Sequence, residues 1–299
     1  MKKSNSNSRK VKTPFVLKML RLTYNTLGRV FPVYFGNRAY QLWFTTTKFK
    51  TPAYELSALE SATKEFIEVN NLKVAVYLWQ HKTIKSTATL LFIHGWTGRG
   101  SQIANYLEQL TQRGYRVISF DSPAHGNTPG KQTSMLEITD VVLALNKKYG
   151  DFDAAITHSV GGMILTFAMS LGLKVDRAAL ICPPNNFQII LDNFKSVLRL
   201  PGSVAQVMER KTFAMHGQVI QNLVDVETNV KTLPCKALII HDEDDMETSW
   251  HSSEKIAQAW PGAKLIKTQG LGHRRIIQDQ QVIQHIVDFL DTEAVDSKQ

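Results

Sequence analysis

Three residues that could together perform nucleophilic catalysis occur along the chain in the order serine, acid, histidine. Ser159 lies in the run DFDAAITHSVGG, and His273 closes the glycine-lined run GLGH. A serine hydroxyl is a weak nucleophile near neutral pH unless a base removes its proton. A histidine on a flexible turn is suited to be that base, and a carboxylate can hold it in the required tautomer. The residue types therefore predict acyl transfer through Ser159.

The acid comes from the run HDEDD, which follows a predicted strand over residues 237–241. A carboxylate at the end of that strand can reach a histidine on the loop after the next strand. Asp242, Asp244 and Asp245 all meet this description; we favour Asp245, and the choice among the three stays open. A cation site in this loop is disfavoured against a solvated acidic loop, because no matching histidine or carboxylate pair accompanies it.

The residues around Ser159 predict a nucleophile elbow, which is a sharp turn between a strand and a helix. An apolar strand is expected over 152–157 and a helix over 160–171. On such a turn the hydroxyl stands above the sheet edge. Gly161 would let the chain pass close to its neighbours, since it lacks a Cβ. Thr157 replaces the first glycine of the usual G-x-S-x-G pattern, which predicts a slightly altered elbow. The alternative is that Ser159 only caps the helix.

A glycine-bearing loop, HGWTG over residues 94–98, directly follows another predicted strand. Such a loop can turn a backbone N–H toward the site. The N–H groups of Trp96 and Val160 would form an oxyanion hole for a developing alkoxide. His94 is expected to bond to backbone around this loop, and His158 to point away from the nucleophile.

Strands and helices alternate with short links over most of the chain, which predicts a parallel sheet covered on both faces. An antiparallel edge is expected from two strands joined by a tight turn at Asn70 and Asn71. The predicted strands are 65–69, 73–80, 90–93, 115–120, 152–157, 178–182, 237–241 and 264–268. The predicted helices are 101–113 (with Ser101 as N-cap), 134–149, 160–171, 248–260 and 275–290.

The charge is concentrated at the start of the chain. Residues 1–50 contain eleven Lys and Arg and no Asp or Glu, so with a net charge of +9 the rest carries −2. A nearly neutral body argues against a nucleic-acid partner. The basic segment has two interpretations, attachment to an anionic membrane surface or packing of its aromatics on the flank of the domain. We favour the second, because a membrane helix should show a cleaner apolar face than Phe15, Met19 and Leu22 with Lys18 and Arg21 elsewhere.

Compartment and cofactors follow from what the sequence contains. Cys182 and Cys235 are too few and too isolated for a disulfide framework and fit a reducing compartment. No apolar run approaches the roughly 20 residues that span a bilayer, and the basic start lacks the apolar core of a signal peptide. We expect a cytoplasmic protein with no cofactor and no metal; under the first interpretation of the basic segment it would also contact the inner membrane surface.

With these motifs the chain resembles the α/β-hydrolase family from about residue 65 to residue 290. The runs that carry the resemblance are HGW at 94–96, FDSPAHGNT at 120–128, THSVGG at 157–162, HDEDD at 241–245 and GLGH at 270–273. In that family the acid comes four residues after a His-Gly pair. His241 and Asp242 stand in for the pair here, which places the acid at Asp245.

The resemblance implies an α/β-hydrolase fold, with a mostly parallel, eight-stranded twisted sheet, helices on both faces and a small helical lid. The predicted domains are an N-terminal extension (1–50), the core (51–184 and 233–295) and the lid insertion (185–232), which reads as helical with breaks at Pro201-Gly202 and Gly217.

The implied activity is that of a carboxylesterase- or lipase-like serine hydrolase. It would cleave an ester, thioester or amide of a small apolar substrate through an acyl-enzyme at Ser159. The alternatives are an acyltransferase or perhydrolase using the same residues, and a catalytically silent binding protein with this fold. A haloalkane dehalogenase or an epoxide hydrolase would need an aspartate at position 159.

Overall fold

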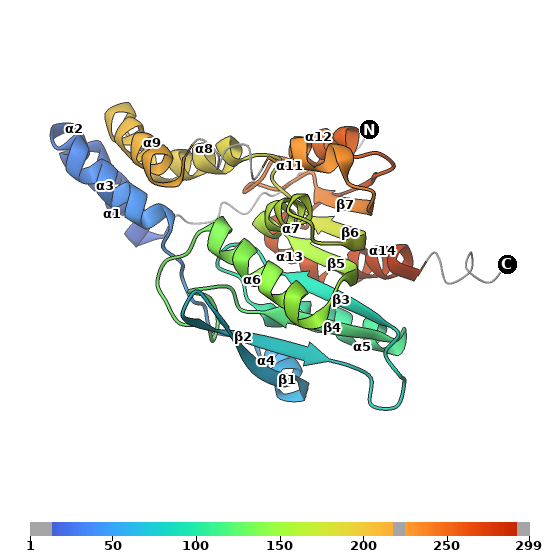
Figure 1. Ribbon diagram of the computed structural model, residues 1–299. Coiled ribbons are helices and arrows are strands. Elements are labelled where there is room, and N and C mark those ends of the chain that lie inside the picture. The colour runs from blue at the N-terminus through green and yellow to red at the C-terminus, as the bar shows by residue number, and fades with distance from the viewer. Residues whose placement is uncertain (1–13, 218–224, 292–299) are drawn as a thin grey trace, which may run out of the picture. The chain divides into compact units, whose positions relative to one another are not determined.

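The computed structural model describes residues 14–217 and 225–291 (Figure 1). They form two compact units. The larger one holds Phe44–Leu191 and the described residues after 217, and the smaller one holds the described residues up to Trp43 together with Asp192–Gly217. Two separate stretches of the chain therefore build the smaller unit.

The larger unit is built on an eight-stranded sheet of order β1-β2-β4-β3-β5-β6-β7-β8. The pairs β1–β2 and β2–β4 are antiparallel, and all the other neighbouring strands are parallel. The mostly parallel, eight-stranded sheet predicted from the sequence is thus confirmed. The strands are β1 (Thr63–Val69), β2 (Leu72–Trp79), β3 (Ala88–Ile93), β4 (Tyr115–Phe120), β5 (Phe152–His158), β6 (Val175–Ile181), β7 (Lys236–Asp242) and β8 (Lys264–Thr268).

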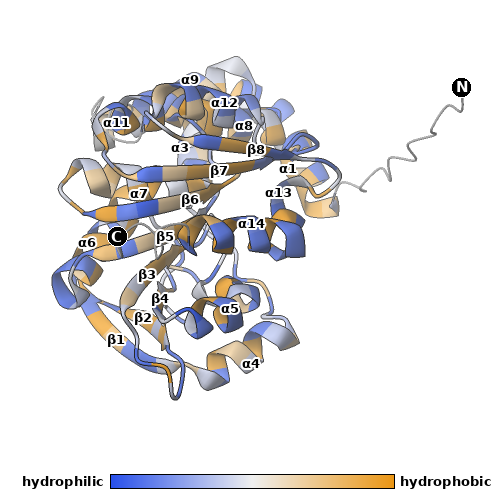
Figure 2. Ribbon diagram, turned by 90° about the vertical axis from the view of Figure 1, so that its right-hand side faces the viewer, coloured by the Kyte–Doolittle hydropathy of each residue, from blue (hydrophilic) through white to orange (hydrophobic). Residues whose placement is uncertain are grey.

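Helices cover both faces of this sheet. Both ribbon views place α6 (Met135–Tyr149) and α7 (Val160–Ser170) on one face, and α5 (Leu107–Gln112) and α14 (Gln280–Asp291) on the other (Figures 1 and 2). Every residue of α7 from Val160 to Met169 is buried. The remaining elements of this unit are α4 (Ala53–Ser61), η1 (Gly100–Tyr106), α11 (Val226–Asn229), η2 (Val230–Thr232), α12 (His251–Ala259), α13 (Gly272–Arg275) and η3 (Ile276–Gln278).

Local signals fix several of these boundaries. Asn70 and Asn71 both have positive φ, 50° and 62°, as the predicted tight hairpin turn requires. Helix α6 begins after Ser134, whose hydroxyl accepts from the Glu137 N–H, while the Glu137 carboxylate accepts from the Ser134 N–H. This capping box satisfies two N–H groups that have no partner within the helix.

The prediction that Ser101 caps a helix is wrong. The structure has the 3-10 helix η1 there, and the Ser101 hydroxyl donates to Glu55 Oε2 at 2.7 Å. Arg99 Nη2 also donates to this side chain, to Glu55 Oε1 at 2.8 Å. The buried carboxylate of Glu55, on α4, takes both donors because an unpaired buried charge is costly. The predicted last helix is also interrupted, and α13 and η3 precede α14.

The smaller unit is helical. Close packing joins α3 to α9, since a Cβ added to Gly36 would lie only 2.5 Å from Val207 Cβ. The rings of Trp43 and Phe194 meet edge to face with centroids 5.0 Å apart. The chain breaks predicted at Pro201-Gly202 and Gly217 are confirmed as the limits of α9. Its elements are α1 (Phe15–Asn25), α2 (Leu27–Val30), α3 (Pro32–Trp43), the second half of α8 (Phe187–Leu198) and α9 (Gly202–His216).

The predicted extension and the predicted lid thus both contribute helices to one unit. That the insertion covers the site stays a prediction. None of the described helices combines the length and apolarity needed to cross a bilayer.

Candidate active site

Ser159 lies on a strained turn between β5 and α7. Its φ is 54° and its ψ is −126°, a left-handed conformation that costs a residue with a side chain roughly 1–3 kcal/mol. The Ser159 side chain does not cap α7, so the alternative that it is merely a capping residue is wrong. The turn is tight, because a Cβ on Gly161 would lie 2.5 Å from the carbonyl oxygen of Ile93. The serine therefore occupies this turn for a reason other than local stability.

Asp245 and His273 are brought together at the ends of β7 and β8. His273 Nδ1 donates to Asp245 Oδ2 at 2.6 Å, and the Asp245 side chain is fully buried. Since a carboxylate only accepts, the hydrogen is on Nδ1 and Nε2 is left as a free acceptor. Burial alone would raise the pKa of the Asp245 carboxyl, but hydrogen bonds from His241 and His273 hold it below its usual range. The acid is thus a stable anion.

Asp242 has a different task from Asp245. Its two oxygens accept from the N–H groups of Leu271 and Gly272 at 3.0 and 2.9 Å, and from the Thr268 hydroxyl at 2.8 Å. These bonds fasten the turn that carries His273 onto the strand that carries the acid. Asp244 Oδ2 accepts from the Gly270 N–H, at the exposed rim of the same turn. The solvated loop expected here is wrong for Asp242 and for the Asp245 side chain, because both are buried.

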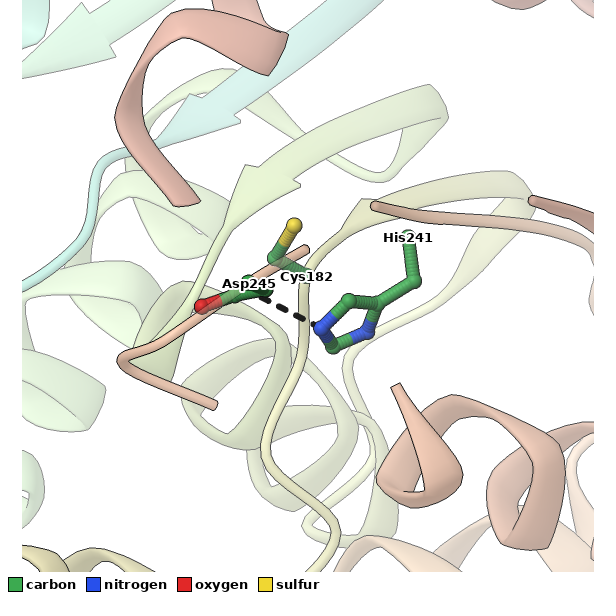
Figure 3. Close-up of side chains that lie close together, drawn as sticks. All are labelled: Cys182, His241 and Asp245. Atoms are coloured by element: carbon green, nitrogen blue, oxygen red, sulfur yellow. Dashed lines mark hydrogen bonds and ion pairs between the residues drawn. The ribbon is translucent and has the colours of Figure 1, made fainter. Parts of the chain in front are cut away.

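A second histidine and a thiol complete the surroundings of the acid (Figure 3). His241 Nε2 lies 3.1 Å from Asp245 Oδ2 and 3.0 Å from the Thr248 carbonyl, and its Nδ1 lies 2.6 Å from the Ser253 hydroxyl. The carbonyl can only accept, so Nε2 carries the hydrogen. Cys182, His241 and Asp245 place their ligand atoms within 4.8 Å of one another, and these are donor types that zinc uses. Both ring nitrogens of His241 already have partners within the protein. The contact between His241 and Asp245 therefore serves to position the acid.

His158 links the nucleophile turn to the histidine turn. Its Nε2 donates to the carbonyl oxygen of His273 at 2.8 Å, and the two rings lie 4.9 Å apart. Burial, together with the neighbouring His273, lowers the pKa of His158 to about 3. His273 is thereby held next to the chain neighbour of Ser159. In the part of the chain that the structure describes, the Ser159 hydroxyl itself makes no hydrogen bond, to His273 or to another group.

The loop after β3 faces the same turn. A Cβ on Gly95 would lie 3.0 Å from Ser159 Cβ and 3.0 Å from His158 Nδ1, so a side chain at this position would collide with the nucleophile turn. Neither the Trp96 N–H nor the Val160 N–H has an acceptor among the described residues. Val160 is the first residue of α7, where N–H groups lack helical acceptors and the helix dipole favours negative charge.

Two neutral histidines brace that loop. His94 Nε2 accepts from the Ser122 N–H, and His125 Nε2 accepts from the Thr97 N–H, each at 3.0 Å. Each Nδ1 faces a carbonyl oxygen and must carry the hydrogen. Burial lowers the pKa of His94 to about 4, and burial together with the neighbouring His94 ring lowers the pKa of His125 to about 3. These bonds fix the loop on both sides of Trp96.

Comparison with known proteins defines the class to which this fold and site belong. Residues 90–285 match the model of the Alpha/beta hydrolase family, and the chain is a member of that family.

A curated relative and two solved structures are similar to parts of the chain. A putative carbamate hydrolase, RutD, of Pseudomonas savastanoi pv. phaseolicola is 33% identical over 70 residues, which are 23% of this chain and 27% of that protein. A putative lipase of Acinetobacter baumannii AYE matches with a TM-score of 0.62 and 16% identity, over 85% of this chain and all (100%) of its own. The esterase Pf2001 of Pyrococcus furiosus matches with a TM-score of 0.59 and 18% identity, over 83% of this chain and 98% of its own. At these identities the two structures establish the fold.

Proposed function

We propose that this hydrolase is a serine esterase-type enzyme that cleaves an ester, thioester or amide through an acyl-enzyme at Ser159. The observation that carries the proposal is the 2.6 Å hydrogen bond from His273 to a buried, ionised Asp245 beside the strained serine turn. It leaves His273 Nε2 as an acceptor, which is the form a general base needs.

The reaction would proceed in two halves. His273 Nε2 takes the Ser159 proton while the serine oxygen attacks the substrate carbonyl, and Asp245 stabilises the resulting imidazolium. The N–H groups of Trp96 and Val160 bind the alkoxide that develops on the carbonyl oxygen. The imidazolium then protonates the departing alcohol, thiol or amine. Water, deprotonated by the same histidine, attacks the acyl-enzyme, releases the acid and restores Ser159.

The serine–histidine hydrogen bond belongs to the complex with substrate in this mechanism. In unliganded enzymes such bonds are often long and tighten only when substrate binds. The contact between His158 and the His273 carbonyl keeps the two turns adjacent in the meantime. The similar proteins support the reaction type, because a carbamate hydrolase, a lipase and an esterase all act on a carbonyl bonded to a heteroatom.

The test combines labelling with kinetics. A fluorophosphonate probe should label Ser159, and Ser159→Ala should abolish labelling while Ser170→Ala, on the same helix, should not. On p-nitrophenyl esters of increasing chain length, His273→Ala should lower kcat by on the order of 10⁴–10⁶, whereas the exposed control His285→Ala should leave it unchanged. Rising kcat/KM with acyl length would support the apolar substrate. A folded wild-type protein that takes no label and hydrolyses no ester would refute the proposal.

A further inference from the structure

The exposed apolar side chains of this protein are concentrated on α1, α2 and α3 of the smaller unit. Nine of the eighteen large apolar side chains exposed in the described part of the chain lie within residues 15–34. Single exposed apolar residues are ordinary, but a concentration of this kind marks an interaction surface. They are Phe15, Val16, Met19, Leu22, Leu27, Val30, Phe31, Val33 and Tyr34.

The charge around this surface has one sign. Residues 1–50 contain no acid, and Lys18, Arg29 and Arg38 are exposed. The sequence of the smaller unit holds two acids in total, Asp192 and Glu209. Both are paired with the same lysine, Lys195. The cations of α1 to α3 are therefore not neutralised within their own unit.

Three of the cations of this unit surround a cavity of about 470 Å³. It is lined by Lys18, Arg21, Leu22, Asn25 and Arg199. Arg21 Nε donates to the Val197 carbonyl at 2.7 Å, and Asn25 Nδ2 donates to the Arg199 carbonyl at 3.0 Å. These bonds hold α1 against the C-terminal end of α8 and the residue that follows it. Cationic walls with ammonium and guanidinium donors fit a phosphate group.

The cavity and the apolar surface are adjacent on α1. Phe15, Met19 and Leu22 are spaced i, i+4 and i+7, so they lie along one face of the helix. Lys18 and Arg21, spaced i and i+3, lie beside that face on the same side of the helix as each other. Figure 2 shows the hydrophobic colouring of α1. A ridge of apolar side chains thus runs beside a basic cavity, which is the arrangement of helices that lie in a membrane interface.

We propose that α1 to α3 dock on the surface of an anionic phospholipid bilayer. The lipid phosphates would bind in the basic cavity, and the apolar ridge would enter the acyl boundary. Within the smaller unit Phe15, Met19 and Leu22 are exposed, which makes these side chains available to enter a bilayer. The proposal concerns binding and does not depend on the hydrolase mechanism.

The experiment is co-sedimentation of the full chain with vesicles of phosphatidylcholine, alone or mixed with phosphatidylglycerol. Binding should require phosphatidylglycerol and weaken as salt rises. The double variant Lys18→Gln, Arg199→Gln should lower the partition coefficient by on the order of 30-fold, at about 1 kcal/mol per charge near the surface and 1.4 kcal/mol per tenfold. The matched control Lys82→Gln, Lys85→Gln removes two exposed cations from the larger unit and should leave binding unchanged.

A second pair of variants tests the apolar ridge. Phe15→Ser should lower binding by at least about tenfold, because one buried Phe contributes roughly 1.5–3 kcal/mol. Phe66→Ser, at a phenylalanine of the larger unit that is 62% exposed against 75% for Phe15, should have no effect. Unaltered circular dichroism shows that each variant is folded. Equal binding to both vesicle types, or variants that bind like the wild type, would overturn the proposal. So would a dimer that Phe15→Ser dissociates in a protein that binds no vesicle, because the ridge would then be covered by a second copy.

Discussion

Lowering the pH from about 7 to about 5 should destabilise this protein through three buried histidines. His94, His125 and His158 have folded pKa values of about 4, 3 and 3, chiefly because of burial. In the unfolded chain each imidazole titrates near 6.5. The folded pKa values lie below the unfolded one, so the unfolded chain binds more protons throughout this range. Stability is therefore complete above about pH 6.5 and is lost as the pH falls.

The magnitude follows from the same values. Near pH 5 the unfolded histidines are almost fully protonated and the folded ones are neutral, which amounts to roughly 2 kcal/mol per histidine relative to pH 7. The three together contribute about 6 kcal/mol, which is a large part of the 5–15 kcal/mol of a typical fold. The Asp245 carboxyl, with its lowered pKa, loses its contribution only below about pH 4. The window between pH 5 and 7 thus isolates the histidines.

Urea unfolding at a series of pH values would measure this effect, with the fluorescence of the buried Trp79 and Trp260 as the signal. The slope of the unfolding free energy near pH 5.5 should correspond to nearly three protons, or roughly 4 kcal/mol per pH unit. His125→Gln keeps an acceptor for the loop N–H but cannot titrate, and should remove about a third of the slope. The exposed control His285→Gln should leave it unchanged. A wild-type slope below about one proton would refute the reasoning, since the buried imidazoles would then protonate without unfolding.

Three substitutions test other contacts of the site. Asp242→Ala should cost about 2–4 kcal/mol in urea unfolding, because it leaves three backbone N–H groups without their acceptor. It should also lower kcat of ester hydrolysis more than it raises KM by loosening His273, and Asp242→Asn should recover part of both losses; unchanged kcat in the alanine variant would contradict this. Gly161→Ala should cost at least about 1–3 kcal/mol, since its Cβ would overlap a carbonyl oxygen of β3. Glu55→Gln should cost about 3–5 kcal/mol by leaving Arg99 without its buried anion, and a loss under 1 kcal/mol would show that the guanidinium is solvated instead.

The sheet could be predicted from the sequence because its signals are local. Each buried strand is an apolar run bounded by turn residues, and the asparagine pair between β1 and β2 specifies a hairpin. The positions of Ser159, of the acidic loop and of His273 followed from the same regularity, and the family resemblance placed the acid at Asp245. In a parallel sheet the carboxyl ends of the strands meet at one edge, and each of the three residues follows a strand there.

Contacts made across long sequence separations could not be predicted in this way. The bond between His158 and the His273 carbonyl spans 115 residues, and Arg99 meets Glu55 across 44. Nothing in the local pattern of either residue specifies its partner. Asp242 did carry a signal, because an acid at the glycine position of the family pattern needs donors. Those donors are the N–H groups of Leu271 and Gly272, in the turn that follows β8. Only the folded sheet, in which β7 and β8 are neighbours, brings them within reach of Asp242.

The two-part construction of the smaller unit has a consequence for how the chain is made. Contacts such as those of Arg21 with Val197 and of Lys211 with Asn37 join residues 176 and 174 positions apart. At about 5–20 residues per second, the first helices leave the ribosome roughly 10–35 s before their partners do. The apolar side chains that pack against those partners stay uncovered for that interval. We therefore expect holdase chaperones to bind the nascent chain. A variant that begins at Phe44 would lack α3, on which α9 packs, and should be recovered mainly as insoluble protein.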